Sequence, residues 1–236
     1  MKGAILQCDE VLAKFQPEFG RYPAMIERMF AAVADNIVCD CFDCRLGQYP
    51  ENINDYDFFI TTGSRSSVYD DEPWIEQLIT FVRLLDKERK KLIGICFGHQ
   101  VIAMASNGKV EKSEKGWAVG LANNRVVAAP EWIGEPVDHL QILVSHQDQI
   151  SVLPNGATVI AESDFCPYFI IQWNDRFLSI QGHPEWRREY SKALMQDRRS
   201  LIGDEMIEAG IKSLAAAPDS QLFTRWLIDF IQCPLT

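Results

Sequence analysis

The sequence predicts an α/β fold: a mostly parallel, open sheet flanked by helices, with a small antiparallel excursion. Two observations lead to this prediction. In the first part of the chain, short apolar segments alternate with segments whose apolar residues recur at helical spacing. This rhythm is typical of a parallel sheet covered by helices. After Gly108 the pattern changes to short strands separated by turn residues, which indicates antiparallel pairing.

The helices of the first part are indicated by their apolar faces. Residues 22–34 carry apolar side chains at positions 25, 26, 29, 30 and 33, and residues 74–85 repeat this spacing. Residues 98–105 also suit a helix. The expected strands of this part are residues 3–8, 36–42, 56–61 and 92–95.

The rest of the chain is expected to continue the sheet and to end in helices. Residues 187–202 and 219–232 are predicted to be helical, the second starting at Pro218-Asp219-Ser220. No repeat or linker is visible, so residues 1–236 are expected to form a single domain with C-terminal helices from about 187. The expected strands here are residues 110–119, 124–127, 140–144, 158–162, 168–173 and 177–181.

Charge and composition narrow the possible functions. The chain of 236 residues has a formal net charge of −10, and such an acidic chain repels phosphate backbones, so we expect no nucleic-acid partner. The apolar run near the N-terminus is too short for a signal peptide, and no stretch approaches the roughly 20 apolar residues of a membrane helix. The seven cysteines suit free thiols in a reducing compartment. We therefore expect a cytoplasmic protein without a membrane partner.

A candidate nucleophile stands where an apolar strand meets a helix. Residues 92–100 read Leu-Ile-Gly-Ile-Cys-Phe-Gly-His-Gln, which places Cys96 between Gly94 and Gly98. This is the cysteine form of a nucleophile elbow, in which glycines permit a sharp strand-to-helix turn. The helix N-terminus then favours the thiolate. The backbone N–H of Phe97 is placed to receive a developing oxyanion.

The remaining cysteines suggest a simpler interpretation. A buried, inert thiol is the usual state of a free cysteine, and we expect it for these six. Cys39, Cys41 and Cys44 superficially resemble a metal site. Their spacing lacks the paired Cys-x-x-Cys pattern of zinc sites, so we expect no metal there and no cofactor.

The candidate base follows a later strand. His183 comes just after the strand at 177–181, so it should reach the same edge of the sheet as the nucleophile. Glu185 lies two residues further on, and in extended chain both side chains project from one face. Pro184 favours that extended geometry at His183. The alternative is a surface histidine in a loop.

These motifs resemble a known family. The elbow at 94–100, together with Gly182-His183-Pro184-Glu185, resembles the class I (triad-type) glutamine amidotransferases. Further segments, at 19–23, 62–70, 115–120 and 145–148, are similar to free-standing members akin to the GMP synthase glutaminase domain and to γ-glutamyl peptidases. The resemblance implies a flavodoxin-like α/β fold of the amidotransferase type. It also implies that Cys96, His183 and Glu185 form a Cys-His-Glu triad.

The resemblance implies further site residues. The turn after the third strand, with Gly63 and Ser64, would supply the second oxyanion donor beside Phe97. Ser64 and Arg65 stand where the glutamine enzymes usually carry Gly and Pro, so the preferred amide stays open. The residues that match the glutamine pocket are Gln100, Ser145, His146, Gln147 and Asp148, although polar side chains on a helix and a loop need no such role.

The expected activity is cysteine-dependent hydrolysis of a γ-glutamyl amide, glutamine to glutamate and ammonia, through a thioester. A separate synthase subunit could then accept the ammonia, since the chain has no phosphate-binding Gly-x-x-x-x-Gly-Lys-Ser/Thr motif of its own. A second possibility is a γ-glutamyl peptidase that acts on γ-glutamyl peptides or conjugates. The sequence also leaves open a non-catalytic binding or regulatory module of the same fold, and a redox sensor that uses the thiol without hydrolysis.

Overall fold

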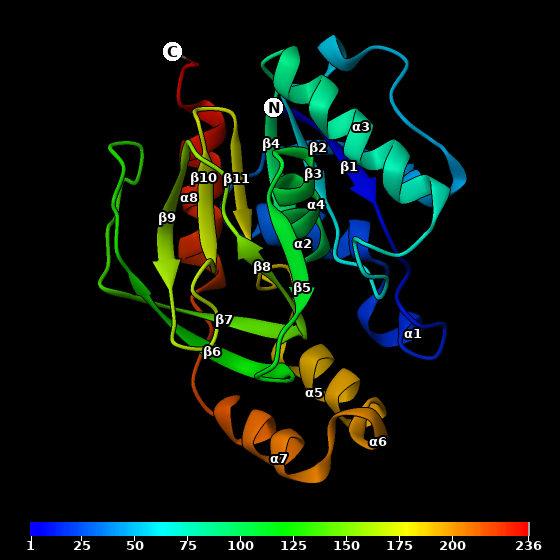
Figure 1. Cartoon of the computed structure of the whole chain (residues 1–236), viewed down its shortest axis with the longest axis vertical. Coiled ribbons are helices and arrows are strands. Elements are labelled where there is room, and N and C mark those ends of the chain that lie inside the picture. The colour runs from blue at the N-terminus through cyan, green and yellow to red at the C-terminus, as the bar shows by residue number, and fades with distance from the viewer. Residues whose placement is uncertain (236) are drawn as a thin grey trace.

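The computed structural model describes residues 1–235, and its centre is a large mixed sheet (Figure 1). Within these residues, nine strands form this sheet in the order β2-β1-β3-β4-β11-β10-β9-β6-β7. The parallel half comprises β2 (Val38–Asp43), β1 (Lys2–Gln7), β3 (Phe58–Thr61), β4 (Lys91–Ile95) and β11 (Phe177–Ile180). The predicted mostly parallel α/β sheet is thus confirmed.

The antiparallel part extends the same sheet beyond β11. It comprises β10 (Ile170–Trp173), β9 (Ala157–Glu162), β6 (Ala118–Val126) and β7 (His139–His146). A separate antiparallel pair is formed by β5 (Lys109–Lys112) and β8 (Asp148–Val152), in which Lys112 stands opposite Asp148. This pair matters for function because it borders the site described below.

Helices cover both faces of the parallel half (Figure 1). On one face, α2 (Tyr22–Ala31) and α8 (Ser220–Gln232) bury Ile26, Phe30 and Trp226 against β1 and β3. On the other face, α3 (Pro73–Lys87) and α4 (Phe97–Ala105) contribute to a second apolar cluster. Short helical turns are α1 (Gln16–Phe19), η1 (Cys44–Leu46) and η2 (Ile53–Asp55).

A third group of helices lies beyond the antiparallel strands, at the bottom of Figure 1. It consists of α5 (Arg188–Asp197), α6 (Arg199–Ile202) and α7 (Asp204–Ser213). A third apolar cluster joins α5 and α7 to α2 and β7, with Tyr190, Ile207 and Leu143 buried in it. Gly120 and Gly210 let α7 approach β6, because a Cβ at Gly120 would lie 2.6 Å from the Gly210 carbonyl oxygen.

Three details differ from the sequence prediction. The strand expected at 110–119 is divided between β5 and β6, with a turn at Gly116, whose φ is +79°. The helix expected at 187–202 divides at Arg198 into α5 and α6. Strand β8 and helix α7 were not predicted from the sequence. Strand β8 follows β7 after one residue, so no turn signal separates the two.

None of the helices within residues 1–235 combines the length and the hydrophobicity of a membrane-spanning segment.

Candidate active site

The turn from β4 into α4 holds Cys96 in a backbone conformation that few side chains adopt. Its φ is +49° and its ψ is −95°, and the side chain is buried against the core. A Cβ at Gly98 would lie 1.6 Å from Thr61 Oγ1, and one at Gly94 would lie 2.8 Å from the Gly98 carbonyl oxygen. The two glycines are therefore required by close packing around the turn, as an elbow demands.

Polar groups contact the Cys96 sulfur from the neighbouring strand. Gln181, which follows β11, donates from Nε2 to Cys96 Sγ at 3.5 Å. Gln100 on α4 in turn donates to Gln181 Oε1 at 3.1 Å. Phe97 is the first residue of α4, so its N–H belongs to the first helical turn, whose donors have no partner within the helix. The sulfur thus lies beside free backbone donors and the positive end of a helix.

His183 and Glu185 meet at the edge where Cys96 lies. His183 Nδ1 donates to Glu185 Oε1 at 2.9 Å, and both side chains are almost completely buried. The His183 backbone N–H is anchored to the Leu143 carbonyl at 2.8 Å. Trp186 stacks on the imidazole, with ring centroids 3.6 Å apart and planes 9° from parallel. The imidazole is thereby fixed from two directions.

The charge state of His183 depends on these neighbours. Burial is the largest influence and lowers the pKa of His183, but the charges of Cys96 and Glu185 and hydrogen bonds with both raise it, and the net value is about 9. An imidazolium between a thiolate and a carboxylate is the arrangement that produces such a shift. His183 therefore interacts with both predicted partners.

Gly63 brings the turn after β3 against the same two side chains. A Cβ at this position would lie 2.8 Å from His183 Cε1 and 3.6 Å from Cys96 Cβ. Thr62 holds the turn, since its hydroxyl accepts from the Cys8 N–H at 2.8 Å and donates to the Gly63 carbonyl at 2.9 Å. The Gly63 backbone consequently runs directly beside the Cys96–His183 pair.

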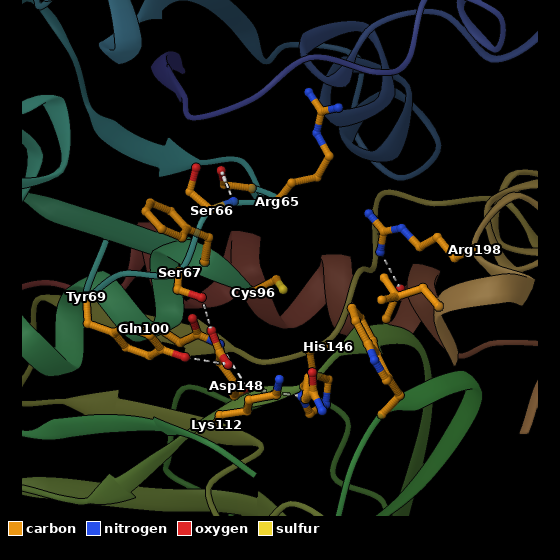
Figure 2. A pocket seen from close by; sticks show the side chains of 16 residues that line it. Arg65, Ser66, Ser67, Tyr69, Cys96, Gln100, Lys112, His146, Asp148 and Arg198 are labelled. Atoms are coloured by element: carbon orange, nitrogen blue, oxygen red, sulfur yellow. Dashed lines mark hydrogen bonds between the residues drawn. The ribbon is translucent and has the colours of Figure 1, made fainter. Parts of the chain in front are cut away.

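A cavity of about 380 Å³ opens beside Cys96 (Figure 2). The five residues expected to bind substrate all line it, as do Ser64 and Phe97. Asp148 is fixed by two hydroxyl donors, Ser67 Oγ at 2.6 Å and Tyr69 OH at 3.0 Å. His146 is buried, which lowers its pKa to about 4, so its imidazole is neutral. The structure therefore gathers the predicted substrate-binding residues around one cavity with Cys96, whereas Gly63, His183 and Glu185 lie outside its lining.

Several lining residues were missed by the sequence analysis. Ser67, Tyr69, Lys112, Trp117 and Arg198 border the cavity. Ser67 and Tyr69 lie in segment 62–70 and Trp117 lies in segment 115–120, and the family resemblance noted for both segments was an available signal. Lys112, on β5, and Arg198, at the junction of α5 and α6, both lie outside the motifs noted in the sequence.

The cysteine-rich segment at β2 does not join this site. Cys39 and Cys41 lie on β2, and Cys44 is buried in the apolar cluster beneath α3. Within residues 1–235, no group of three or more His, Cys, Asp or Glu side chains is arranged to hold a metal ion.

Comparison with known proteins gives the family. A profile of the family "Glutamine amidotransferase class-I" matches residues 41–199. Gamma-glutamyl peptidase 2 of Arabidopsis thaliana is 32% identical over 190 residues, covering 77% of each chain. A glutamine-hydrolyzing GMP synthase subunit from Halobacterium salinarum is 32% identical over 95 residues, 40% of this chain and 52% of that protein. A crystal structure of a glutamine amidotransferase from Thermotoga maritima is similar in fold, with a TM-score of 0.75, 20% identity and 98% of both chains covered. Because the family profile matches more than half of the chain, the chain belongs to the class-I glutamine amidotransferase family.

Proposed function

We propose that the protein hydrolyses a γ-glutamyl amide, with Cys96 as nucleophile, His183 as acid and base, and Glu185 as the group that orients the imidazole. The observation that carries the proposal is the convergence at Gly63, where one backbone position lies against both the nucleophile and the base. The buried His183–Glu185 hydrogen bond of 2.9 Å supports the orienting role. A nucleophile, a base and an orienter in contact constitute an activated nucleophile.

The proposed reaction proceeds in two halves. The Cys96 thiolate attacks the γ-carbonyl carbon, and the C–N bond breaks as the imidazolium of His183 gives its proton to the leaving amine. A γ-glutamyl thioester remains on the sulfur. His183, now neutral, takes a proton from water, whose oxygen attacks the thioester and releases glutamate and the thiolate. The imidazolium is regenerated, so protons balance over one turnover.

The oxyanion of each tetrahedral intermediate would be bound by backbone N–H groups. Phe97 offers the N–H of the first turn of α4, and Gly63 and Ser64 offer those of the facing turn. Loss of one such donor lowers kcat by a factor of about 10²–10³. Backbone donors do not depend on the side chain at 64, so the serine is compatible with this role.

The head group of the substrate would bind on the side of the cavity that holds Asp148. A γ-glutamyl group carries an α-ammonium and an α-carboxylate. Asp148 and Lys112 stand opposite each other on β8 and β5 and both line the cavity. The Cβ atoms of directly opposed residues on antiparallel strands lie about 4.5–5.5 Å apart. The carboxylate of Asp148 and the ammonium of Lys112 therefore extend from neighbouring positions, and they match the two charges of the head group.

The leaving group could be ammonia or an amine. The similar peptidase is named for γ-glutamyl peptides, whereas the similar GMP synthase protein is named as glutamine-hydrolyzing. If ammonia is released, a separate synthase subunit could accept it. Residues 1–235 hold their seven cysteines as free thiols, which supports a cytoplasmic location for either reaction.

One experiment tests the activity. Release of glutamate, ammonia and amine is measured over glutamine and γ-glutamyl peptides for the wild type, Cys96→Ala and Cys44→Ala. Cys44 is also buried but lies away from the cavity, so its variant controls for loss of a buried thiol. We expect turnover in the wild type and Cys44→Ala, and a loss of about 10⁴-fold or more in Cys96→Ala. No turnover by the wild type would support the non-catalytic module, whereas turnover that Cys96→Ala retains in full would show that the activity does not depend on Cys96.

A further inference from the structure

The cavity has two sides, and Cys96 separates them. Figure 2 shows Tyr69, Gln100 and Asp148 on one side of the sulfur and Arg198 on the other. The first side is the one assigned above to the γ-glutamyl head group. A substrate whose γ-carbon lies at the sulfur would therefore extend its leaving group toward Arg198.

The charges that line the cavity do not balance without a further anion. Arg65 is neutralised by Asp9, to which its guanidinium donates twice at 2.8 Å. Lys112 and Asp148 together match a zwitterionic head group. Arg198 is the remaining cation, and it forms no ion pair with any carboxylate of residues 1–235. It stands out in a chain whose net charge is −10.

Arg198 is held so that it faces the cavity. It lies at the junction of α5 and α6, where its backbone leaves the first helix. Its Nη1 donates to Ser145 Oγ at 3.0 Å, and its guanidinium lies 5.9 Å from the centre of the Trp117 ring. One hydrogen bond leaves most of the five donors of a guanidinium free, and a planar donor fork binds a carboxylate through two parallel hydrogen bonds. Trp117 and the exposed Leu201 supply apolar surface beside it.

We infer that Arg198, with Ser145 and Trp117, forms a leaving-group subsite for an amine that bears a carboxylate. The substrate class is then a γ-glutamyl amino acid or short γ-glutamyl peptide with a free C-terminal carboxylate, and not glutamine, whose leaving group is ammonia. The inference rests on the proposed hydrolysis at Cys96. The released product is an amino acid or peptide with a free amino group.

The test compares two substrates that differ only in charge at the far end. γ-Glutamyl-phenylalanine carries the carboxylate, and γ-glutamyl-phenylalanine amide replaces it by a neutral group of the same size. The ratio of their kcat/KM values is measured for the wild type, Arg198→Met and Arg199→Met. Arg199 is the neighbouring residue, bound to Asp204 and Glu208 and outside the cavity, so its variant removes the same charge without touching the subsite.

We expect the wild type to prefer the carboxylate substrate by about 10–100-fold, the range that a hydrogen-bonded charge pair supplies. Arg198→Met should bring the ratio close to one, mainly through KM, while Arg199→Met keeps the wild-type ratio. A wild-type ratio near one, or an unchanged ratio in Arg198→Met, would overturn the subsite while leaving the hydrolase intact. Wild-type protein that cleaves neither substrate nor glutamine would instead overturn the proposed function, and the subsite with it.

Discussion

Replacement of Gly63 by alanine tests the geometry on which the proposed chemistry depends. The added methyl group would lie 2.8 Å from His183 Cε1, which is closer than carbon atoms approach in folded proteins, and 3.6 Å from Cys96 Cβ, which is ordinary contact. The φ of Gly63 lies outside the left-handed region, so the backbone itself accepts alanine. The strain therefore falls on the imidazole and not on the turn.

The imidazole cannot yield easily. Trp186 stacks on one of its faces at 3.6 Å, and Glu185 holds Nδ1 at 2.9 Å. To restore normal contact with the new methyl group, the ring must shift by up to about 1 Å, and a displacement of that size at a reacting group costs about 10²-fold in rate. The crowding should lower the free energy of unfolding by about 1–3 kcal/mol.

The assay measures kcat/KM with a γ-glutamyl peptide, together with urea unfolding at the same pH. Gly134→Ala is the matched control, because its nearest neighbour is the end of the Asp229 side chain at 3.3 Å, far from the cavity. We expect a loss of about 100-fold for Gly63→Ala and near wild-type rates for the control. A fully active Gly63→Ala enzyme that unfolds like the wild type would refute the inferred contact between this backbone and the catalytic pair.

Three further substitutions test separate parts of the site. Glu185→Gln removes a charge that raises the pKa of His183 to about 9, so NMR titration of that imidazole should show a lower midpoint. The raised pKa of His183 contributes stability that is complete below pH 6.5 and is lost as the pH rises to about 9. The difference in free energy of unfolding between the wild type and Glu185→Gln, measured in urea, should therefore shrink over that range. A difference that stays constant would contradict the coupling between the two residues. Gln181→Leu removes the donor to Cys96 Sγ, and we expect about a tenfold lower kcat; unchanged kcat would limit that glutamine to packing. In Gly98→Ala the added methyl group would overlap the side chain of Thr61, so we expect a strongly destabilised protein. Soluble protein with wild-type stability in urea would show that the turn is looser than the structure indicates.

The elbow was predictable from sequence because it depends on local backbone requirements. Within a few positions the chain ends a strand, adopts a positive φ at Cys96 and begins a helix, and this sharp turn requires Gly94 and Gly98 on either side. His183 and Glu185 do meet as predicted, but the expected reason, extended chain, is wrong: residues 184 and 185 form a turn, closed by the Trp186 N–H on the His183 carbonyl at 3.4 Å. In both cases the geometry is contained in a short local segment.

The far side of the cavity was not predictable in this way. Arg198 reaches it only because α7 packs on β6 through the close approach at Gly120 and Gly210, which positions the helix group beneath the sheet. Lys112 reaches it only through the pairing of β5 with β8, a strand that the sequence analysis missed. Neither arrangement follows from hydrophobic periodicity, because each is a choice between different tertiary packings of amphipathic segments.

The two sides of the cavity differ in how readily a substitution can change them. The Cys96 side of the cavity is fixed by several mutually dependent close approaches, and a change there displaces the backbone or the imidazole. Arg198, in contrast, is held by one hydrogen bond and one aromatic ring at the junction of two helices. Substitutions at that junction can therefore alter the leaving group while the elbow keeps its geometry, because the side chain of Arg198 hydrogen-bonds to Ser145 and not to Cys96, His183 or Glu185. On this reasoning, a double variant of Gly63→Ala and Arg198→Met should lose kcat/KM toward γ-glutamyl-phenylalanine by the product of the two single losses, and strong non-additivity would show that the two sides are coupled.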